Sequence, residues 1–526
     1  MSIGPGHPDS GLLAGKTVMT VSPTEFTVDI DRQLQLPIYL QICARFRTAI
    51  AAGHLRPGDR VPALRSLATQ LNTARGTVEL AYTVLVDEGY LQMRGAAGTF
   101  VSPSLPASVT GSRTQSTKSS NGTQSVKAAT AAQTPGESHG ARPAPRQLAI
   151  AAAMSGEPRP LQPGLPALDA FPLKVWNRLV SHRARSGEHA MLAYPDPVGY
   201  RPLREHIATY LGLSRGVTCL PDQVFVTGGY RATLELVLRS LARPNDSVWY
   251  EDPGYLLARG FLAETGVQLV AVPVDEDGID VEHGTRLDAQ ARFALVTPSH
   301  QSPLGHTLSL PRRMALLGWA EQASSWIVED DYDSEFRYLG RPLPALKSLD
   351  RRDHVIYCGT FSKVMFPGLR LAYAVVPERA VERVGRVARS MNAGSPTLLQ
   401  AALADFIERG HFARHLKRMR ALYAERRVLI VRALEQAFGE RLIVELPPGG
   451  IQFAAQFVEG PDGPVDDVAV AARAREAGLA VLPLSVWYAN GRTRSTPRGV
   501  VMGFANIANA GEAGHLARSL RACLDG

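Results

Sequence analysis

Cysteine is scarce in this sequence, and long apolar runs are missing from it. The four cysteines among 526 residues, Cys43, Cys219, Cys358 and Cys523, lie far apart and form no CxxC pair. This spacing matches no metal site, so we expect no bound metal and the reduced, mostly buried thiols of a cytoplasmic protein. No apolar run reaches the roughly 18 residues that span a bilayer, and no basic segment followed by an apolar one marks the N-terminus. The sequence therefore predicts neither a membrane segment nor a signal peptide.

The length and charge of the chain indicate several units. At about 150 residues per domain, three or so units are expected for a chain of 526 residues. Apolar residues make up 45%, enough for most of the chain to be globular, and the formal net charge is +8. A basic balance suits an acidic partner such as DNA, although many basic proteins bind no nucleic acid. Residues 1–29, rich in Gly, Pro and Ser, are predicted to be a flexible tail.

Residues 30–102 have the pattern of a small helical module. Helical spacing of apolar residues and two short β-rich runs predict helices over 38–50, 64–71 and 78–85 and strands over 90–94 and 99–101. Three helices with a tight turn between the last two, followed by a hairpin, predict a winged helix-turn-helix. A helical protein-docking domain with a solvated basic face is the alternative.

The order of short motifs in this module closely resembles the DNA-binding domain of the GntR regulators. The matching pieces are Pro57-Gly58, Leu64-Arg65-Ser66-Leu67-Ala68, Arg75-Gly76-Thr77-Val78, Ala81-Tyr82, Glu88-Gly89-Tyr90-Leu91 and Gly98-Thr99-Phe100-Val101. The resemblance implies that Arg65, Arg75 and Thr77 contact double-stranded operator DNA. It also implies that Arg94 lies along the wing near phosphates. Gly76 replaces an asparagine that is common in the family, which removes one potential base contact.

Residues 103–147 form a segment of low complexity. Ser, Thr, Ala, Gly, Gln and Pro dominate it, and large apolar residues are almost missing. Burial in such a segment cannot offset the entropy of the chain, so we expect disorder. A flexible coil of this length has a root-mean-square reach of roughly 35 to 40 Å, which lets the two flanking units move relative to each other. A composition that only aids solubility is the alternative.

Residues 148–526 alternate short β-rich runs with helical stretches. The expected strands are 224–226, 247–250, 293–296, 326–328, 355–357 and 372–376. This alternation predicts an α/β domain with a mostly parallel sheet that helices cover on both faces. Ligand-binding residues of such domains lie on the loops at the strand ends.

Unusual residues follow these strands one after another. Thr227-Gly228-Gly229-Tyr230 precedes a helix, where backbone N–H groups can bind a phosphate. Tyr255 can offer an aromatic face to a planar ring, and the acidic run 329–333 follows the fourth strand. The fifth strand leads to Lys363, which can form a Schiff base with an aldehyde if its surroundings lower its pKa. Taken singly, these are a structural turn, a core tyrosine, a solvated loop or weak Mg²⁺ site, and a surface lysine. Their order along the chain indicates a common site.

That order resembles the fold-type I aminotransferases, which depend on pyridoxal 5′-phosphate (PLP), from about residue 165 onward. The resemblance implies PLP as cofactor, Lys363 as its Schiff-base residue, Asp330 on the pyridine nitrogen and Tyr332 on the phenolic oxygen. It also implies Tyr255 stacked on the ring. The phosphate would be surrounded by Gly229, Tyr230, Thr360, Ser362 and Arg370. The implied fold includes a small C-terminal α+β subdomain over about 400–526.

A GntR-type winged helix joined by a linker to an aminotransferase-like domain resembles the MocR (GabR-like) regulators. Strings typical of that subfamily are Tyr194-Pro195-Asp196-Pro197-Val198-Gly199-Tyr200, Val296-Thr297-Pro298-Ser299-His300-Gln301 and Val328-Glu329-Asp330-Asp331-Tyr332-Asp333. The resemblance implies a homodimer that regulates transcription. Its large domain would sense PLP itself or an amino compound and control operator binding, with genes of vitamin B6 or amino-compound metabolism as candidate targets.

Two positions depart from working aminotransferases. Their C-terminal Arg-Leu-Ser-Phe string, whose arginine grips the substrate carboxylate, corresponds here to Val501-Met502-Gly503-Phe504. Loss of that charge-assisted contact costs about 1.5 to 3 kcal/mol and disfavours ordinary amino-acid turnover. Arg492, Arg494 or Arg498 could reach in instead. The Asn-Pro-x-Gly loop, whose Asn touches the phenolic oxygen, is replaced by Ser302-Pro303-Leu304-Gly305.

Two alternatives to a sensing regulator therefore stay open. One is an active aminotransferase with an accessory DNA-binding head. The other is a scaffold that binds no cofactor and would show no colour with PLP.

Overall fold

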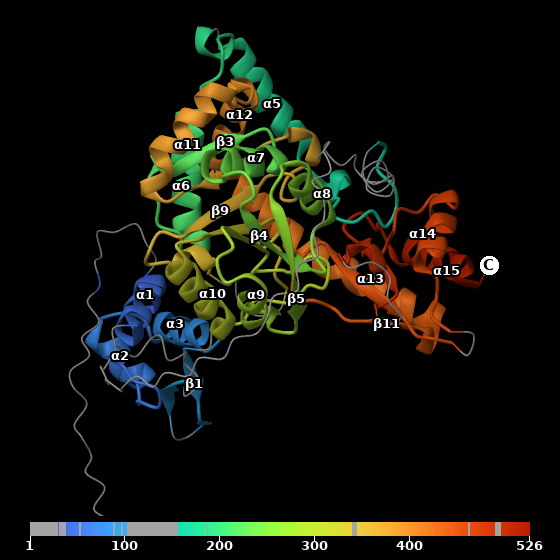
Figure 1. Cartoon of the computed structure of the whole chain (residues 1–526), viewed down its shortest axis with the longest axis horizontal. Coiled ribbons are helices and arrows are strands. Elements are labelled where there is room, and N and C mark those ends of the chain that lie inside the picture. The colour runs from blue at the N-terminus through green and yellow to red at the C-terminus, as the bar shows by residue number, and fades with distance from the viewer. Residues whose placement is uncertain are drawn as a thin grey trace, which may run out of the picture.

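The structure, a computed structural model, consists of a small N-terminal module and a much larger α/β region (Figure 1). It describes residues 30, 38–51, 54–87, 90–95, 98–102, 156–186, 188–338, 344–460, 463–489 and 496–525. The predicted tail and linker, and the side chains of Arg492 and Arg494, lie outside the described residues.

The N-terminal module is a winged helix-turn-helix. Its elements are α1 (Ile38–Ala51), α2 (Leu64–Gln70), α3 (Arg75–Asp87), β1 (Leu91–Met93) and β2 (Thr99–Val101). β1 and β2 pair antiparallel and form the wing. The apolar positions that predicted the helices form one core, in which Phe46 and Tyr82 are fully buried and meet edge to face. The predicted order of elements is confirmed.

An eight-stranded sheet in the order β3-β10-β9-β8-β7-β4-β5-β6 is the centre of the large region. The strands are β3 (Val224–Thr227), β4 (Ser247–Asp252), β5 (Gln268–Asp275), β6 (Gly278–Ile279), β7 (Phe293–Val296), β8 (Trp326–Asp331), β9 (Val355–Thr360) and β10 (Ala372–Val375). β4, β5, β7, β8 and β9 run parallel to their neighbours in this group. β10 lies antiparallel between β9 and β3, so β3 points the same way as β9. The carboxyl ends of β3, β4, β7, β8 and β9 therefore meet at one edge.

Helices cover both faces of this sheet, as predicted. They are α5 (Leu173–Arg185), α6 (Arg201–Arg215), α7 (Tyr230–Leu241), α8 (Leu256–Glu264), α9 (Val281–Asp288), α10 (Leu310–Ala323), α11 (Glu378–Met391) and α12 (Thr397–Glu408). Successive strand residues point to opposite faces. Phe225 and Val248 pack with α7, α8 and α11, whereas Val224 packs with α6 and Trp249 packs with α9 and α10.

The predicted strands are all present, but some of their bounds differ and two strands were not predicted. β5 and β6 were not predicted, because Pro273 and the polar ends of β5 interrupt its β-rich pattern. The acidic residues expected on the loop after the fourth strand begin inside it. β8 runs on to Asp331 because its pairing with β9 continues through Asp330 and Cys358 to Asp331 and Gly359. β9 likewise extends to Thr360.

A second, antiparallel sheet of four strands stands beside the C-terminal helices. Its strands are β11 (Leu442–Val444), β12 (Gln452–Phe457), β13 (Leu482–Pro483) and β14 (Gly499–Gly503), and its helices are α13 (His411–Phe438), α14 (Asp467–Glu476) and α15 (Ala510–Asp525). The segment around Leu161 joins this unit, since the Leu161 carbonyl accepts a hydrogen bond from Gly503 N at 2.9 Å. This hydrogen bond fixes the segment next to β14, from where Gly164 reaches the main sheet at Lys363.

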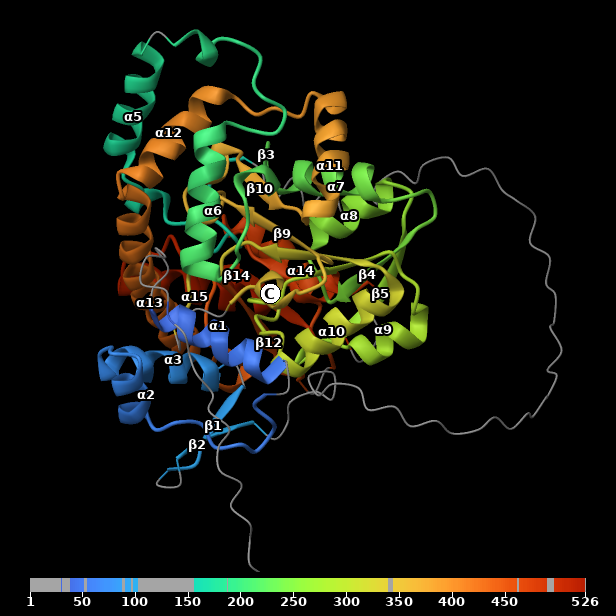
Figure 2. The ribbon, with the colours of Figure 1, turned by 90° about the vertical axis from the view of Figure 1, so that its left-hand side faces the viewer.

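The winged helix rests on the large region through α10 (Figure 2). Leu310 and Met314 of α10 and the nearby Leu349 pack against the apolar core of the module. Within the ranges given above, no helix is both long and apolar enough to cross a membrane. No group of three or more His, Cys, Asp or Glu residues in those ranges could hold a metal ion.

Candidate cofactor site and DNA-binding surface

The side chains expected to bind a cofactor converge at the carboxyl edge of the main sheet. Gly229 follows β3, Tyr255 follows β4, Asp330 lies at the end of β8 and Lys363 follows β9. Arg370 stands just before β10, which begins at the same edge because it runs antiparallel to β9. Parallel strands bring these distant positions together because each strand ends at the same edge.

Lys363 is the amine at the centre of this site. Its Nζ donates a hydrogen bond to the Gly164 carbonyl at 2.7 Å. Burial lowers the pKa of Lys363, and the carboxylates of Asp333 and Asp330 oppose that shift. Gly164 has a φ of +68° and faces the amine so closely that a Cβ there would overlap Nζ. No sequence motif indicated Gly164, since it lies far along the chain from the strand ends.

Asp330 is a buried carboxyl at the end of β8. It is 6% exposed. Burial raises the pKa of Asp330 to about 8, while the nearby Tyr230 hydroxyl acts in the opposite direction. In the described part of the chain, no lysine, arginine or histidine forms an ion pair with Asp330. A protonated ring nitrogen is the kind of group that would compensate such a carboxyl.

A small cup for an anion lies between the N-terminus of α7 and the loop after β9. Gly229 has a φ of +115°, and a Cβ built on it would lie 2.8 Å from Arg370 Nη2. The Arg370 side chain is exposed, and Thr360 Oγ1 accepts a hydrogen bond from Ser362 N at 3.2 Å. The helix N-terminus, the guanidinium and the hydroxyls are all groups that bind a phosphate.

Ser395 belongs to the same cup, although no sequence motif predicted it as a site residue. It is 3% exposed, and its Oγ makes no hydrogen bond in the described part of the structure. A Cβ on Gly228 would lie 3.9 Å from that Oγ. The hydroxyl of Tyr230 is likewise buried without a hydrogen bond of good geometry. Ser395 lies just before α12, so no strand-end motif could have indicated it.

Two tyrosines, Tyr255 and Tyr332, lie near the Asp330 carboxyl. Tyr255 immediately precedes α8, and its ring centroid lies 6.3 Å from that of Tyr230. Tyr332 directs its hydroxyl to His300 Nδ1 at 3.1 Å, and His300 Nδ1 lies 2.9 Å from Asp333 Oδ1. Burial and the carboxylates of Asp333 and Asp330 raise the pKa of Tyr332, which keeps its hydroxyl protonated.

These features together fit PLP. The buried carboxyl of Asp330 could pair with a pyridinium nitrogen. The Lys363 amine, whose pKa is lowered, could form a Schiff base with an aldehyde. The glycine beside Arg370 leaves room for a phosphate that a Cβ would fill. Each of the nine predicted cofactor residues is described, and the structure brings them to one edge of the sheet.

Val501, which the sequence pattern sets in the place of the aminotransferase arginine, is fully buried. It lies in β14 opposite Ala454 and Leu482. Its apolar cluster includes Leu484 and Trp487, with Tyr255 packed against the edge. Of the three arginines that could replace that cation, only Arg498 is described, and its carbonyl accepts a hydrogen bond from Phe457 N at 2.8 Å.

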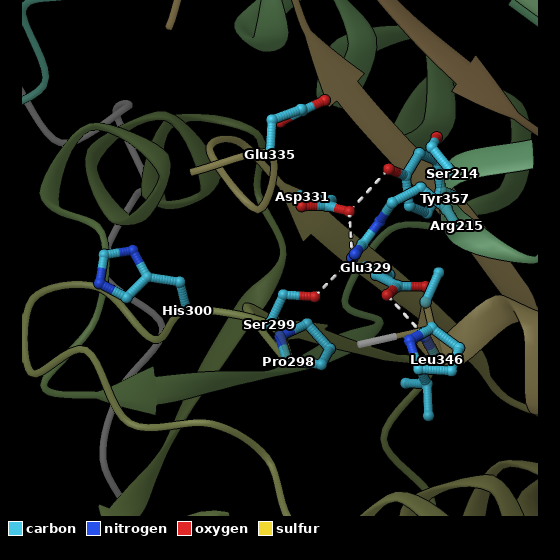
Figure 3. A network of polar contacts seen from close by, with 12 residues as sticks. Ser214, Arg215, Pro298, Ser299, His300, Glu329, Asp331, Glu335, Leu346 and Tyr357 are labelled. Atoms are coloured by element: carbon cyan, nitrogen blue, oxygen red, sulfur yellow. Dashed lines mark hydrogen bonds and ion pairs between the residues drawn. The ribbon is translucent and has the colours of Figure 1, made fainter. Parts of the chain in front are cut away.

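A polar network lies beneath the site, on the other face of β8 (Figure 3). Arg215 at the end of α6 pairs with Asp331 at 2.6 Å, and both side chains are at most 3% exposed. Arg215 also donates to Ser299 Oγ at 2.7 Å, while Tyr357 donates to Asp331 Oδ2 at 2.7 Å. Burial opposes the charge of Arg215, yet the Asp331 carboxylate raises the pKa of Arg215 above its ordinary value. Asp330 and Asp331 thus serve opposite faces of one strand.

The predicted DNA contacts lie on the outer side of the winged helix. Arg65 in α2 and Arg75 at the start of α3 are exposed, and Thr77 is half-buried. Arg94 follows β1, with its guanidinium 5.0 Å from the Phe100 ring centroid on β2. A Cβ on the exposed Gly76 would meet no atom within 4 Å, so α3 presents backbone there.

The fold and this site define a class: a fold-type I aminotransferase domain fused to a bacterial DNA-binding domain. Residues 170–500 match the family of class I and II aminotransferases. Residues 38–101 match the gntR family of bacterial regulatory proteins.

Comparisons over the whole length narrow this class. The chain is 37% identical over 479 residues, 91% of it and 92% of the relative, to the probable rhizopine catabolism regulatory protein MocR of Rhizobium meliloti. It is 31% identical to the pyridoxine biosynthesis transcriptional regulator PdxR of Corynebacterium glutamicum, over 89% of this chain and 91% of that one. The crystal structure of LysN, an α-aminoadipate aminotransferase of Thermus thermophilus complexed with N-(5′-phosphopyridoxyl)-L-leucine, covers 72% of this chain and 97% of its own. That match has a TM-score of 0.63 and 26% identity. The chain belongs to the MocR-type regulators.

Proposed function

We propose that this protein is a transcription regulator that binds operator DNA through its winged helix and senses PLP, or an amino compound joined to it, through its large domain. The observation that best supports sensing over turnover is that cofactor-binding side chains and an apolar cluster lie at the same site. A full set of cofactor-binding side chains adjoins the apolar Val501 cluster, which offers no charge to a substrate carboxylate.

The proposed roles of the central residues follow from their environment. Lys363 would anchor the aldehyde carbon, because a lowered pKa favours the unprotonated, nucleophilic form of the amine. Asp330 would hold a proton on the pyridine nitrogen, and Tyr332 would donate to the phenolic oxygen. Tyr255 would cover one face of the ring. When bound, PLP supplies an aromatic ring that withdraws electrons from an attached amine.

The phosphate would lie at the N-terminus of α7. Gly229 and Tyr230 would offer backbone N–H groups, and Arg370 would supply positive charge. Thr360, Ser362 and Ser395 would supply hydroxyl donors. This division of roles explains why the cup needs a glycine beside Arg370.

Val501 supports a sensor because a bound amino acid would lose its usual charged partner. A buried carboxylate without a bidentate arginine loses about 1.5 to 3 kcal/mol of charge-assisted bonding. PLP itself, or an amine without an α-carboxylate, does not depend on that contact. The name of the pyridoxine biosynthesis regulator among the relatives favours the vitamin B6 family of effectors.

A route from the site to the DNA-binding module runs through α10. The loop that carries His300 leads directly into α10, where buried Arg313 donates to the carbonyls of Pro298 and Leu308 at 3.0 and 2.8 Å. Leu310 and Met314 then contact the winged helix. A ligand that moves this loop would change the placement of the module, provided it binds the two arrangements with different affinities.

The proposed regulator acts as a homodimer in the cytoplasm. Two large apolar side chains on the loop before α6, Leu192 and Tyr194, are 88% and 92% exposed. Adjacent exposed apolar groups of this size favour a contact with a second copy.

The proposal is tested by DNA binding with and without PLP. We expect purified protein to acquire a visible band with PLP and to change its gel-shift affinity or footprint on DNA upstream of its own gene. An unchanged affinity and footprint in the presence of the band would overturn the sensing function.

The rival function, an active aminotransferase, predicts a different result in the same cuvette. Amino acids added to the coloured protein should change the band stoichiometrically or not at all if the protein is a sensor. Fast catalytic conversion to the pyridoxamine form, followed by turnover with a keto acid, would identify an enzyme. Protein that stays colourless would favour the scaffold.

Arg75→Ala is expected to weaken operator binding. If Arg75 reads a base, the loss is about 1 to 3 kcal/mol and relaxes specificity at one position, whereas a phosphate contact weakens binding to all sequences equally. Gel shifts on operator and scrambled DNA measure both. Arg45→Ala is the matched control, because Arg45 is an exposed arginine on α1, a helix to which no DNA contact is assigned. Equal effects of the two variants would contradict the predicted interface.

A further inference from the structure

A buried histidine, His300, and a buried carboxylate, Asp333, lie beside Tyr332 in the candidate site. His300 is 6% exposed and comes from the loop after β7, and Asp333 is 0% exposed and follows β8. His300 Nδ1 lies 2.9 Å from Asp333 Oδ1 and 3.1 Å from the hydroxyl of Tyr332. One ring nitrogen therefore faces two groups.

The surroundings are shaped to hold this ring. Gly450, just before β12, has a φ of +83° and lies so close that a Cβ there would overlap the imidazole. Gly305 has a φ of +79°, and its Cβ would lie 3.2 Å from His300 Nε2. Asp333 Oδ2 also accepts a hydrogen bond from Ile451 N at 3.3 Å. Two separate segments, around Gly305 and around Gly450, thus pack against the pair.

Counting protons decides what Nδ1 can do. A ring nitrogen either carries one hydrogen or offers one lone pair, so it can serve only one of its two neighbours well. Asp333 is fully buried, and in the described part of the chain its other donor is the Ile451 amide, on the opposite oxygen. A buried carboxylate left without a donor is costly, so the Nδ1 proton belongs to Asp333. The Tyr332 hydroxyl then cannot donate to Nδ1, and its proton is left for another acceptor.

We propose that His300 and Asp333 act as a positioning pair that holds the Tyr332 hydroxyl toward the phenolic oxygen of the bound cofactor. The pair would take over the task of the asparagine that Ser302 replaces. This inference rests on the proposed cofactor site, and it deepens that site by giving the phenolic oxygen a donor whose proton His300 Nδ1 does not accept. Burial and the carboxylates of Asp333, Asp330 and Glu251 raise the pKa of Tyr332, and a hydrogen bond with the Ser302 side chain opposes that rise.

The experiment is a spectroscopic pH titration of protein loaded with PLP. A donor to the phenolic oxygen stabilises its negative charge, so loss of that donor should raise the pH at which the visible band changes. His300→Leu is expected to change the proton equilibrium about tenfold in this direction, as Tyr332→Phe does. His300→Asn should titrate like the wild type, because an asparagine amide can replace Nδ1 as the donor to Asp333.

A double variant separates positioning from a general structural effect. If His300 acts through Tyr332, His300→Leu should add nothing to the shift in a Tyr332→Phe background. Asp333→Asn, which keeps the shape of the carboxyl, provides the same comparison if His300→Leu does not fold. Additive shifts, or unshifted variants that hold a normal band, would overturn the pair. A wild type that acquires no band at all would overturn the cofactor site first, and the pair with it.

Discussion

Lys363→Ala should abolish the visible band of protein mixed with PLP. The side chain is the one amine that the described structure places at the carboxyl edge beside Asp330, and burial lowers its pKa, which favours the reactive, unprotonated form. Without the covalent bond we expect affinity for PLP to fall at least about a hundredfold, or about 2.7 kcal/mol. Absorbance and equilibrium dialysis measure the two effects. The gel-shift response to PLP should vanish too, while binding to DNA without PLP persists.

Lys347→Met is the control for this loss. Lys347 is also a buried lysine, 9% exposed, but its Nζ donates to the Val355 carbonyl at 2.7 Å at the opposite end of the sheet. The control should keep the band, with thermal melting showing that both variants are folded. A Lys363→Ala protein that still shows the band would place the reactive amine elsewhere and refute the assignment.

The sequence predicted the parts of the site that follow strand ends in order. Gly229, Asp330 and Lys363 each stand next to a short β-rich run, so their meeting at one edge follows from parallel pairing. Asp330 was expected on a loop, yet it lies inside β8, because pairing with β9 continues past the apolar residues. The chemistry of the carboxyl was unaffected by that difference, since the strand end faces the same edge.

The residues that the sequence did not indicate depend on tertiary packing. Gly164 reaches Lys363 only because the segment at Leu161 joins β14. Ser395, just before α12, contributes its hydroxyl to the anion cup at the N-terminus of α7. The contact between His300 and Asp333 joins two loops that are neighbours only in the folded sheet. β5 was overlooked because Pro273 is tolerated near the edge of a sheet, where one side has few partners.

Breaking the buried polar network on the other face of β8 should lower the free energy of unfolding more than breaking a surface ion pair. Arg215→Met removes the partner of Asp331 and leaves a carboxylate that is 1% exposed without its cation. Breaking a buried pair from one side costs about 3 to 5 kcal/mol, so the urea midpoint of the large region should fall strongly. Arg201→Met is the control on the same helix, since Arg201 pairs with Glu205 and Asp222 while 53% exposed. That exposed pair should contribute little.

The same variant should also change how stability depends on pH. Burial, followed by the Asp331 charge, raises the pKa of Glu335 from 4.5 to about 7, and Arg215 is one of the groups that oppose this rise. The folded protein therefore keeps a proton that the unfolded chain releases, so this contribution is present at low pH and is lost as the pH rises through 7. Without Arg215 the pKa of Glu335 should rise further, and stability should continue to fall above neutrality. Urea midpoints at about pH 5.5 and about pH 8 test the sign, because a larger deficit of the variant at the lower pH would contradict this electrostatic account.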